Sequence, residues 1–224
     1  MRMVGERFLW VSVYAIAMAF LEAVVVAYIR QLLYITDDHV SLGPFARMEV
    51  WREAATVVML VAVGWMAGRS KLDRWSYGLF AFGMWDIWYY AWLKVLLGWP
   101  ETLFDWDTLF LIPLRWWGPV SSPMLVAALI CVTAVLAVVR IERGQRIKIA
   151  PARVGIVGLG GLLALYVFMS DSLHALLRGR PDWATLRPGP FRWPLFLLAL
   201  ILMALPSLAT VWPVARNTRE VQSS

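Results

Sequence analysis

Six apolar segments dominate this chain, and each is as long as the roughly 20 residues that a helix needs to cross the hydrocarbon core of a bilayer. Hydrophobic residues make up 61% of the chain and charged residues 16%, whereas soluble domains average about 45–50% and about 25%. This composition excludes a water-soluble globular domain, and the high hydrophobicity excludes a disordered chain. We predict an all-α, polytopic integral membrane protein that forms a single transmembrane domain over residues 1–224, with six helices at residues 8–34, 48–68, 77–98, 120–141, 154–177 and 194–214.

The basic residues predict the orientation of these helices. Lys and Arg gather at the N-terminus, in the second and fourth loops and in the C-terminal tail, so the positive-inside rule puts both termini in the cytoplasm. The loops on the other side are longer and rich in Pro, Gly and Trp, although the fifth loop is basic as well. Because the net charge of +6 arises largely from the loops, we expect a multi-pass protein of the cell membrane and no nucleic acid partner.

Few residues suit redox or metal chemistry. Cys131 is the one cysteine, which excludes an intramolecular disulfide and a thiolate-rich metal site. The spacing Asp171-x-x-His174 occurs in di-metal helix bundles, but those bundles need a second such pair, and the sequence has none. Nucleotide-binding loops and the common hydrolase motifs are also missing from the sequence. We therefore expect neither a metal nor another cofactor.

Ionisable residues inside the predicted spans mark the candidate site. A charge near the centre of a bilayer costs at least ~2.5 kcal/mol, so its presence needs a reason. Glu22 lies near the middle of the first span and has no partner within one turn of its own helix. Asp86 lies near the middle of the third span. On the predicted topology nearly all such groups fall at mid-depth or in the outer half, which predicts a polar cavity that opens away from the cytoplasm.

The second span carries a stripe of four polar residues. Glu49, Arg52, Glu53 and Thr56 stand at positions i, i+3, i+4 and i+7, which is one face of a helix. Arg52 can pair with Glu49, and it should also attract a carboxylate from a neighbouring helix, such as Glu22. Two interpretations stay open: an ion-paired packing seam that fixes the register of the helices, or a cavity wall that carries carboxylates and a guanidinium.

The third span combines an acid with aromatic residues. Asp86, Tyr89 and Tyr90 share one face, and Lys94 follows two turns after Asp86. Removal from water favours the protonated form of a carboxyl group, so Asp86 is a candidate proton donor unless a nearby cation holds it ionised. The tyrosines and Trp85 would form an aromatic wall of the cavity. An aromatic belt at the membrane surface is the alternative interpretation of these rings.

Residues 100–112, between the third and fourth spans, predict a short amphipathic helix at the membrane surface. Trp99, Trp106 and Phe110 recur at helical spacing, and a proline at position 100 suits the first turn. Such a helix is either an interfacial anchor or a lid. As a lid, it would bring Trp106 and Asp107 to the cavity.

Three functional hypotheses follow from these patterns. In the first, the cavity binds a lipophilic small molecule of lipid or isoprenoid type and could modify it by acid–base chemistry, with Glu22 and Asp86 as proton carriers and Arg52 as an electrostatic clamp. The second is a non-catalytic accessory or assembly subunit of a larger membrane complex, and the third is a small proton-coupled transporter. Membrane lipids are the expected partners, with further copies of the chain or other membrane subunits as alternatives. The predicted ligand-binding residues are Glu49, Glu53, Thr56, Trp85, Tyr89, Tyr90, Lys94, Trp106 and Asp107.

Overall fold

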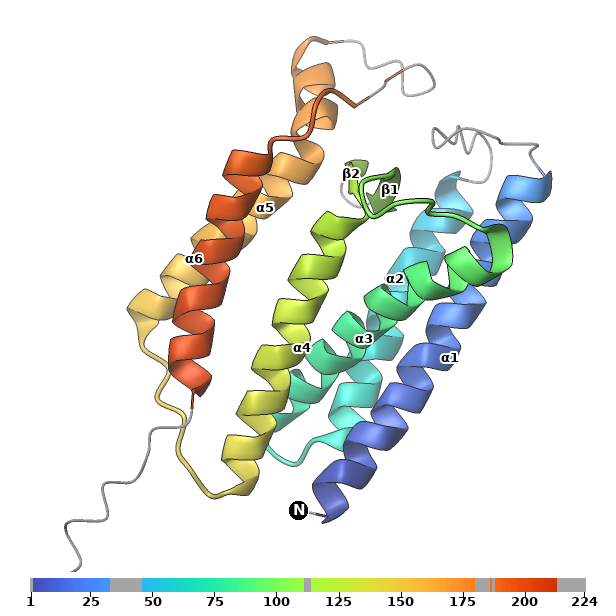
Figure 1. The fold of residues 1–224 in the computed structure, drawn as a ribbon. Helices are drawn as coiled ribbons and strands as arrows, with labels where there is room; N and C mark the ends of the chain where they lie inside the picture. Colours follow the sequence, from blue (N-terminus) through green and yellow to red (C-terminus); the bar gives the residue numbers. More distant parts are fainter. Residues whose placement is uncertain (1, 33–45, 111–113, 180–185, 187, 213–224) are drawn as a thin grey trace, which may run out of the picture.

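The computed structural model describes residues 2–32, 46–110, 114–179, 186 and 188–212, and it is mainly helical (Figure 1). Each of its helices overlaps one of the segments that the sequence predicts as helical, so the predominantly helical fold is confirmed. A two-stranded hairpin lies between the third and fourth helices. The elements are α1 (Arg2–Leu32), α2 (Ala46–Ala67), α3 (Lys71–Leu97), β1 (Trp106–Phe110), β2 (Trp116–Pro119), α4 (Ser121–Glu142), α5 (Pro151–Leu177) and α6 (Trp193–Val211).

Among the described helices, α1, α2, α4, α5 and α6 are long and apolar enough to cross a membrane. The third helix, α3, has 27 residues, as many as α5. It is less apolar because Trp and Tyr take the place of aliphatic residues in its middle turns, where Asp86 also lies. These findings fit a multi-pass membrane protein. That α3 also crosses the membrane remains a prediction.

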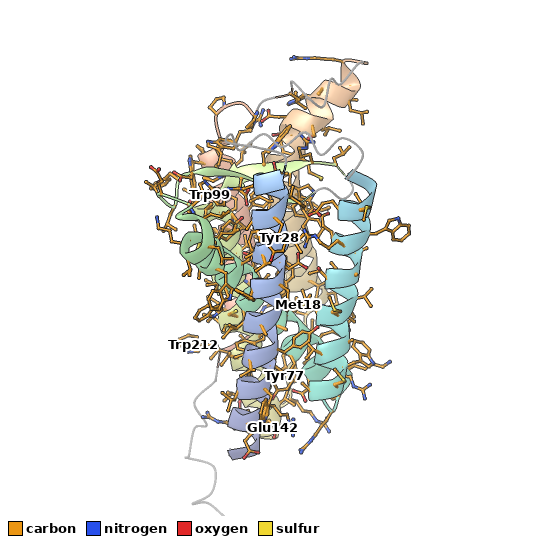
Figure 2. All side chains as sticks on the ribbon, turned by 90° about the vertical axis from the view of Figure 1, so that its right-hand side faces the viewer. Met18, Tyr28, Tyr77, Trp99, Glu142 and Trp212 are labelled. Atoms are coloured by element: carbon orange, nitrogen blue, oxygen red, sulfur yellow. The ribbon has the colours of Figure 1, made fainter. Side chains whose placement is uncertain are left out.

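Helices α1, α2 and α4 pack against α3, whereas α5 and α6 form a second pair (Figure 1). Tyr77 of α3 is fully buried, and its ring lies 5.0 Å from that of Phe8 on α1. Figure 2 shows Met18 and Tyr77 well below Trp99, which lies near the end of the bundle that carries the hairpin. We call this the hairpin end. At the opposite end, Arg7 of α1 is paired with Glu142 of α4 at 3.1 Å.

Two glycines allow α2 and α3 to cross at close range. A Cβ atom added to Gly64 would lie 2.6 Å from the Cα atom of Gly78 and 2.6 Å from the carbonyl oxygen of Arg74. No side chain fits at such a distance, because both neighbours are backbone atoms. Small residues at helix crossings permit this kind of backbone contact in membrane proteins. The crossing therefore fixes the separation of two helices that line the candidate site.

Replacing Gly64 by Ala should lower the stability of the protein by about 1–2 kcal/mol, because the added methyl group overpacks the crossing. Thermal unfolding in detergent, followed by tryptophan fluorescence, measures this loss. Gly158→Ala is the matched control, because a Cβ atom at Gly158 meets no other atom within 4 Å. An equal loss of stability in both variants would contradict the close crossing.

The prediction of an interfacial helix between α3 and α4 is wrong, because β1 and β2 form an antiparallel hairpin there. The chain turns before β1 around Asp105, whose carboxylate accepts hydrogen bonds from the Thr102 hydroxyl at 2.6 Å and from the backbone N–H of Glu101 at 2.6 Å. Side-chain bonds of this kind compete with helix formation. The Thr102 hydroxyl and the backbone N–H groups of Thr102 and Glu101 also hold the pKa of Asp105 below its usual value. Aromatic and β-branched residues at 106–110 then favour a strand.

Candidate functional site

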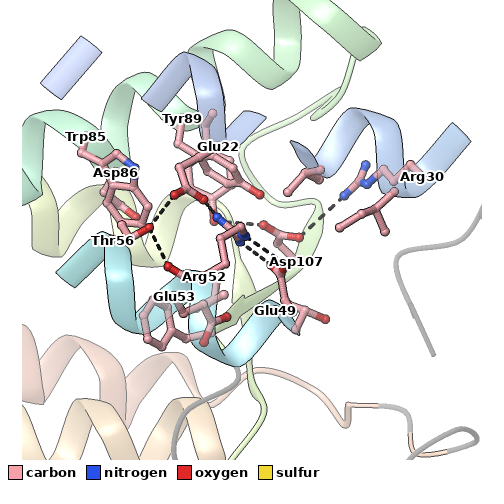
Figure 3. Close-up of a pocket in the computed structure, with 16 residues that line it drawn as sticks. Glu22, Arg30, Glu49, Arg52, Glu53, Thr56, Trp85, Asp86, Tyr89 and Asp107 are labelled. Atoms are coloured by element: carbon pink, nitrogen blue, oxygen red, sulfur yellow. Dashed lines mark hydrogen bonds and ion pairs between the residues drawn. The ribbon is translucent and has the colours of Figure 1, made fainter. Parts of the chain in front are cut away.

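A cavity of about 100 Å³ lies between α1, α2, α3 and β1 (Figure 3). It is well above the roughly 10–15 Å³ that one water molecule requires. Three of the four elements, α1, α3 and β1, contribute both polar groups and apolar or aromatic groups to its wall. The contribution of α2 is entirely polar. The lining residues are Glu22, Val26, Ile29 and Arg30 of α1, Glu49, Arg52, Glu53 and Thr56 of α2, Trp85, Asp86, Tyr89 and Tyr90 of α3, and Asp107, Thr108, Leu109 and Phe110 of β1.

Arg52 connects carboxylates from two helices. Its guanidinium is ion-paired with Glu22 of α1 and with Glu49 of its own helix, and its Nε donates to Glu49 at 2.9 Å. The Thr56 hydroxyl lies within hydrogen-bonding distance of Glu22 and of the Arg52 carbonyl oxygen. The Glu22 side chain is only 8% exposed, whereas that of Arg52 is 26% exposed. The guanidinium is therefore the accessible member of this group, and Glu22 is the enclosed one.

A second ion pair joins the hairpin to α1. Nη2 of Arg30 lies 3.7 Å from Oδ1 of Asp107, and the Tyr90 hydroxyl donates to Oδ2 of Asp107 at 3.2 Å (Figure 3). The Arg30 guanidinium also lies 4.2 Å from the centroid of the Trp99 ring, a favourable cation–π geometry. Asp107 is 6% exposed. These contacts hold β1 against the cavity from two different helices.

Among the described residues that line the cavity, two on α3 carry a buried polar atom without a hydrogen-bond partner. Oδ2 of Asp86 and Nε1 of Trp85 are both buried and both unpartnered. Buried polar atoms in folded proteins nearly always have a partner, and each exception needs an explanation. Both residues line the cavity. A molecule in the cavity that offers polar hydrogens or a positive charge would satisfy the carboxylate of Asp86.

The cavity carries more carboxyl groups than cations. Five acidic residues face two arginines, so the charge would be −3 with every group ionised (2 − 5). Unbalanced charge of one sign is unfavourable in an enclosed site, because desolvation is costly and like charges repel. The site therefore favours the uptake of protons or of a positively charged group. The acids are Glu22, Glu49, Glu53, Asp86 and Asp107, and the cations are Arg30 and Arg52.

Aromatic rings form a row along α3 beside these charges. Trp85 and Tyr89 are stacked with ring centroids 6.2 Å apart, and Tyr89 meets Tyr90 edge-on at 5.1 Å. Tyr90 in turn lies 6.3 Å from Trp99, just after the end of α3. Carboxylates on α1 and α2 thus lie across the cavity from an aromatic surface on α3 (Figure 3).

The structure brings most of the predicted site residues to this cavity, but Lys94 and Trp106 do not line it. The Lys94 ammonium donates to the carbonyl oxygens of Gly98 at 3.0 Å and Pro100 at 2.8 Å, so it satisfies backbone groups at the end of α3. Trp106 packs edge-on against Phe191 at 6.0 Å.

Arg30 and the apolar residues of the lining are not among the site residues predicted from the sequence. Val26, Ile29 and Arg30 follow Glu22 at i+4, i+7 and i+8, so the same stripe rule that identified the polar face of α2 would have found them. The contributions of Thr108, Leu109 and Phe110 had no such signal, because the sequence predicts a surface helix where β1 lies.

Asp171, the acidic residue of the Asp171-x-x-His174 spacing, is paired with groups near the start of α6. Asp171 lies 3.6 Å from the Arg192 guanidinium and accepts a hydrogen bond from the backbone N–H of Gly189 at 3.0 Å. Within the part of the chain that the structure describes, no group of three or more His, Cys, Asp or Glu residues could hold a metal ion. Asp171 therefore ties α5 to the segment that precedes α6.

Comparisons with known proteins identify no relative. No protein-family model matches the chain, and neither a curated protein nor a solved structure matches it significantly. What the site does must therefore follow from its own chemistry.

Proposed function

We propose that this protein crosses the cell membrane with six helices and binds a lipophilic small molecule in the cavity between α1, α2, α3 and β1. The convergence of carboxyl groups from all four elements on one cavity with an aromatic wall is the observation that carries this proposal. Glu22 and Asp86 serve as proton carriers at the site, and Arg52 serves as an electrostatic clamp between α1 and α2.

Both termini lie in the cytoplasm in this proposal, and the cavity belongs to the outer half of the membrane. The N-terminus, the basic loop from α2 to α3 and the basic loop from α4 to α5 all lie at the end opposite the hairpin (Figure 1). The positive-inside rule assigns that end to the cytoplasm. The hairpin and the cavity beside it then belong to the outer side, within reach of molecules in the outer leaflet.

Narrowing the cavity tests the proposal. The protein is purified from native membranes in a mild detergent, and bound lipophilic molecules are extracted and identified by mass spectrometry. Val26 lines the cavity, so Val26→Trp should reduce the retained molecule by about tenfold or more, because the indole takes its place. Val58→Trp is the matched control, since Val58 is 66% exposed on the lipid-facing side of α2.

An accessory subunit is the second candidate, and the Glu22–Arg52–Glu49 pairing favours it, because ion pairs between helices also occur as packing seams. Under this alternative Val26→Trp and the control would retain the same lipids in the same amounts. A partner membrane subunit would instead copurify with the protein in stoichiometric amounts. Equal lipid retention in wild type and Val26→Trp would therefore overturn the binding proposal.

A further inference from the structure

We infer that the ligand of this cavity is a cationic amphiphile: a protonated amine attached to an apolar body. This inference rests on the proposed binding function and adds the chemical class of the ligand. It follows from three features of the site: the engagement of its arginines, the surroundings of Asp86 and the aromatic row on α3.

The two arginines are already occupied by carboxylates. Arg52 is paired with Glu22 and Glu49, and Arg30 is paired with Asp107 and lies over the Trp99 ring. An anionic head group, such as a phosphate, would have to break one of these pairs and would meet the remaining acids of the cavity. The charge balance of the lining therefore disfavours an anion and favours a cation.

Within the described part of the chain, Asp86 is the acidic residue of the cavity that has a buried oxygen atom without a hydrogen-bond donor. Its buried Oδ2 atom has no hydrogen-bond partner among the described residues, and its carboxylate is repelled electrostatically by Asp107. A positive charge near both carboxylates removes this repulsion, and an ammonium N–H gives Oδ2 a donor. Neither an uncharged nor an anionic ligand would do both.

The aromatic row fits the same ligand. Trp85, Tyr89 and Tyr90 present ring faces and edges along one wall, and a cation within about 6 Å of a ring centroid is attracted by the ring quadrupole. Arg30 over Trp99 already uses this interaction at the end of the row. Beside the charged groups, Val26, Ile29, Leu109 and Phe110 offer an apolar surface for the body of the ligand.

A pair of small probes with similar size and opposite charge tests this inference on the full-length protein in detergent. Benzylammonium, a protonated amine, is the cation and benzoate is the anion, and their binding is measured by equilibrium dialysis. We expect saturable binding of the cation by the wild-type protein and at least tenfold weaker binding of the anion. This comparison needs no variant and so does not depend on how a substitution folds.

Asp86→Asn should weaken binding of the cation by about tenfold, because hydrogen bonds to charged groups contribute more than neutral ones. Asp171→Asn is the matched control, since Asp171 lies on α5, is paired with Arg192 and does not line the cavity. Binding of the cation should be unchanged in this control. Equal losses in both variants would overturn the assignment of Asp86.

The outcomes separate this inference from the proposed function. If the benzoate binds and Val26→Trp abolishes its binding, the cavity accepts lipophilic molecules but the inferred ligand class is wrong. If neither probe binds saturably, the cationic class is overturned, and the copurified molecules decide the binding function independently.

Discussion

Arg52→Gln is expected to destabilise the protein by about 2–3 kcal/mol, because it leaves Glu22 and Glu49 without the cation that both share. Removing one partner of a fully buried pair costs about 3–5 kcal/mol. The expected loss is smaller here because the Arg52 side chain is 26% exposed. For a protein of this size the loss corresponds to a fall of roughly 5–10 °C in the unfolding temperature. Thermal unfolding in detergent measures it.

A second substitution shows whether the loss comes from an unpaired acid. In the double variant Glu22→Gln/Arg52→Gln, much of the stability should return, because the more enclosed carboxylate no longer needs a cation. Arg69→Gln is the control, since Arg69 is exposed and its change should stay within about 0.5 kcal/mol. If the losses of Glu22→Gln and Arg52→Gln simply add, these two side chains are not coupled.

The same double variant bears on the two candidate functions. A packing seam needs only that charges cancel, so a seam would tolerate the neutral pair. A ligand site needs the particular arrangement of charge around its cavity, so binding should be lost although the fold is retained. Stability and binding therefore respond differently to one variant, and this difference separates a binding protein from an accessory subunit.

Local rules predicted much of this site from the sequence. The stripe at Glu49, Arg52 and Thr56 follows from helical spacing alone, and so does the shared face of Asp86 and Tyr89. The cost of charge at lipid depth then predicts that such faces meet one another and not the lipid. The observed cavity unites these faces.

The hairpin could not be predicted in this way, because helical spacing of aromatic residues also occurs by chance in a short loop. Asp105 decides the local structure by accepting hydrogen bonds from residues that precede it, which a periodicity rule does not consider. Pairing of β1 with β2 then depends on contacts across residues 106–119. The position of Lys94 outside the cavity could not be predicted for a related reason. Its ammonium contacts backbone carbonyl oxygens that follow α3, and these contacts depend on the path of the chain after Gly98.

Arg30→Gln should open the hairpin, because Asp107 would lose its cation while remaining 6% exposed. We expect the local opening free energy of β1 and β2 to fall by about 2 kcal/mol, which is roughly a 30-fold faster amide exchange. Hydrogen-exchange mass spectrometry measures this rate peptide by peptide, and peptides from α4 serve as an internal reference. Exchange that accelerates equally in α4 would indicate general unfolding instead.

The contacts of Asp107 predict a graded series. Tyr90→Phe removes one neutral donor at 3.2 Å, so it should weaken the hairpin by about 1 kcal/mol, less than Arg30→Gln does. Lys71→Gln, at the far end of α3, should leave hairpin exchange unchanged. Because β1 forms one wall of the cavity, faster opening should also speed the release of a bound molecule. If Arg30→Gln accelerates neither exchange nor release, the Arg30–Asp107 pair does not hold the hairpin over the site.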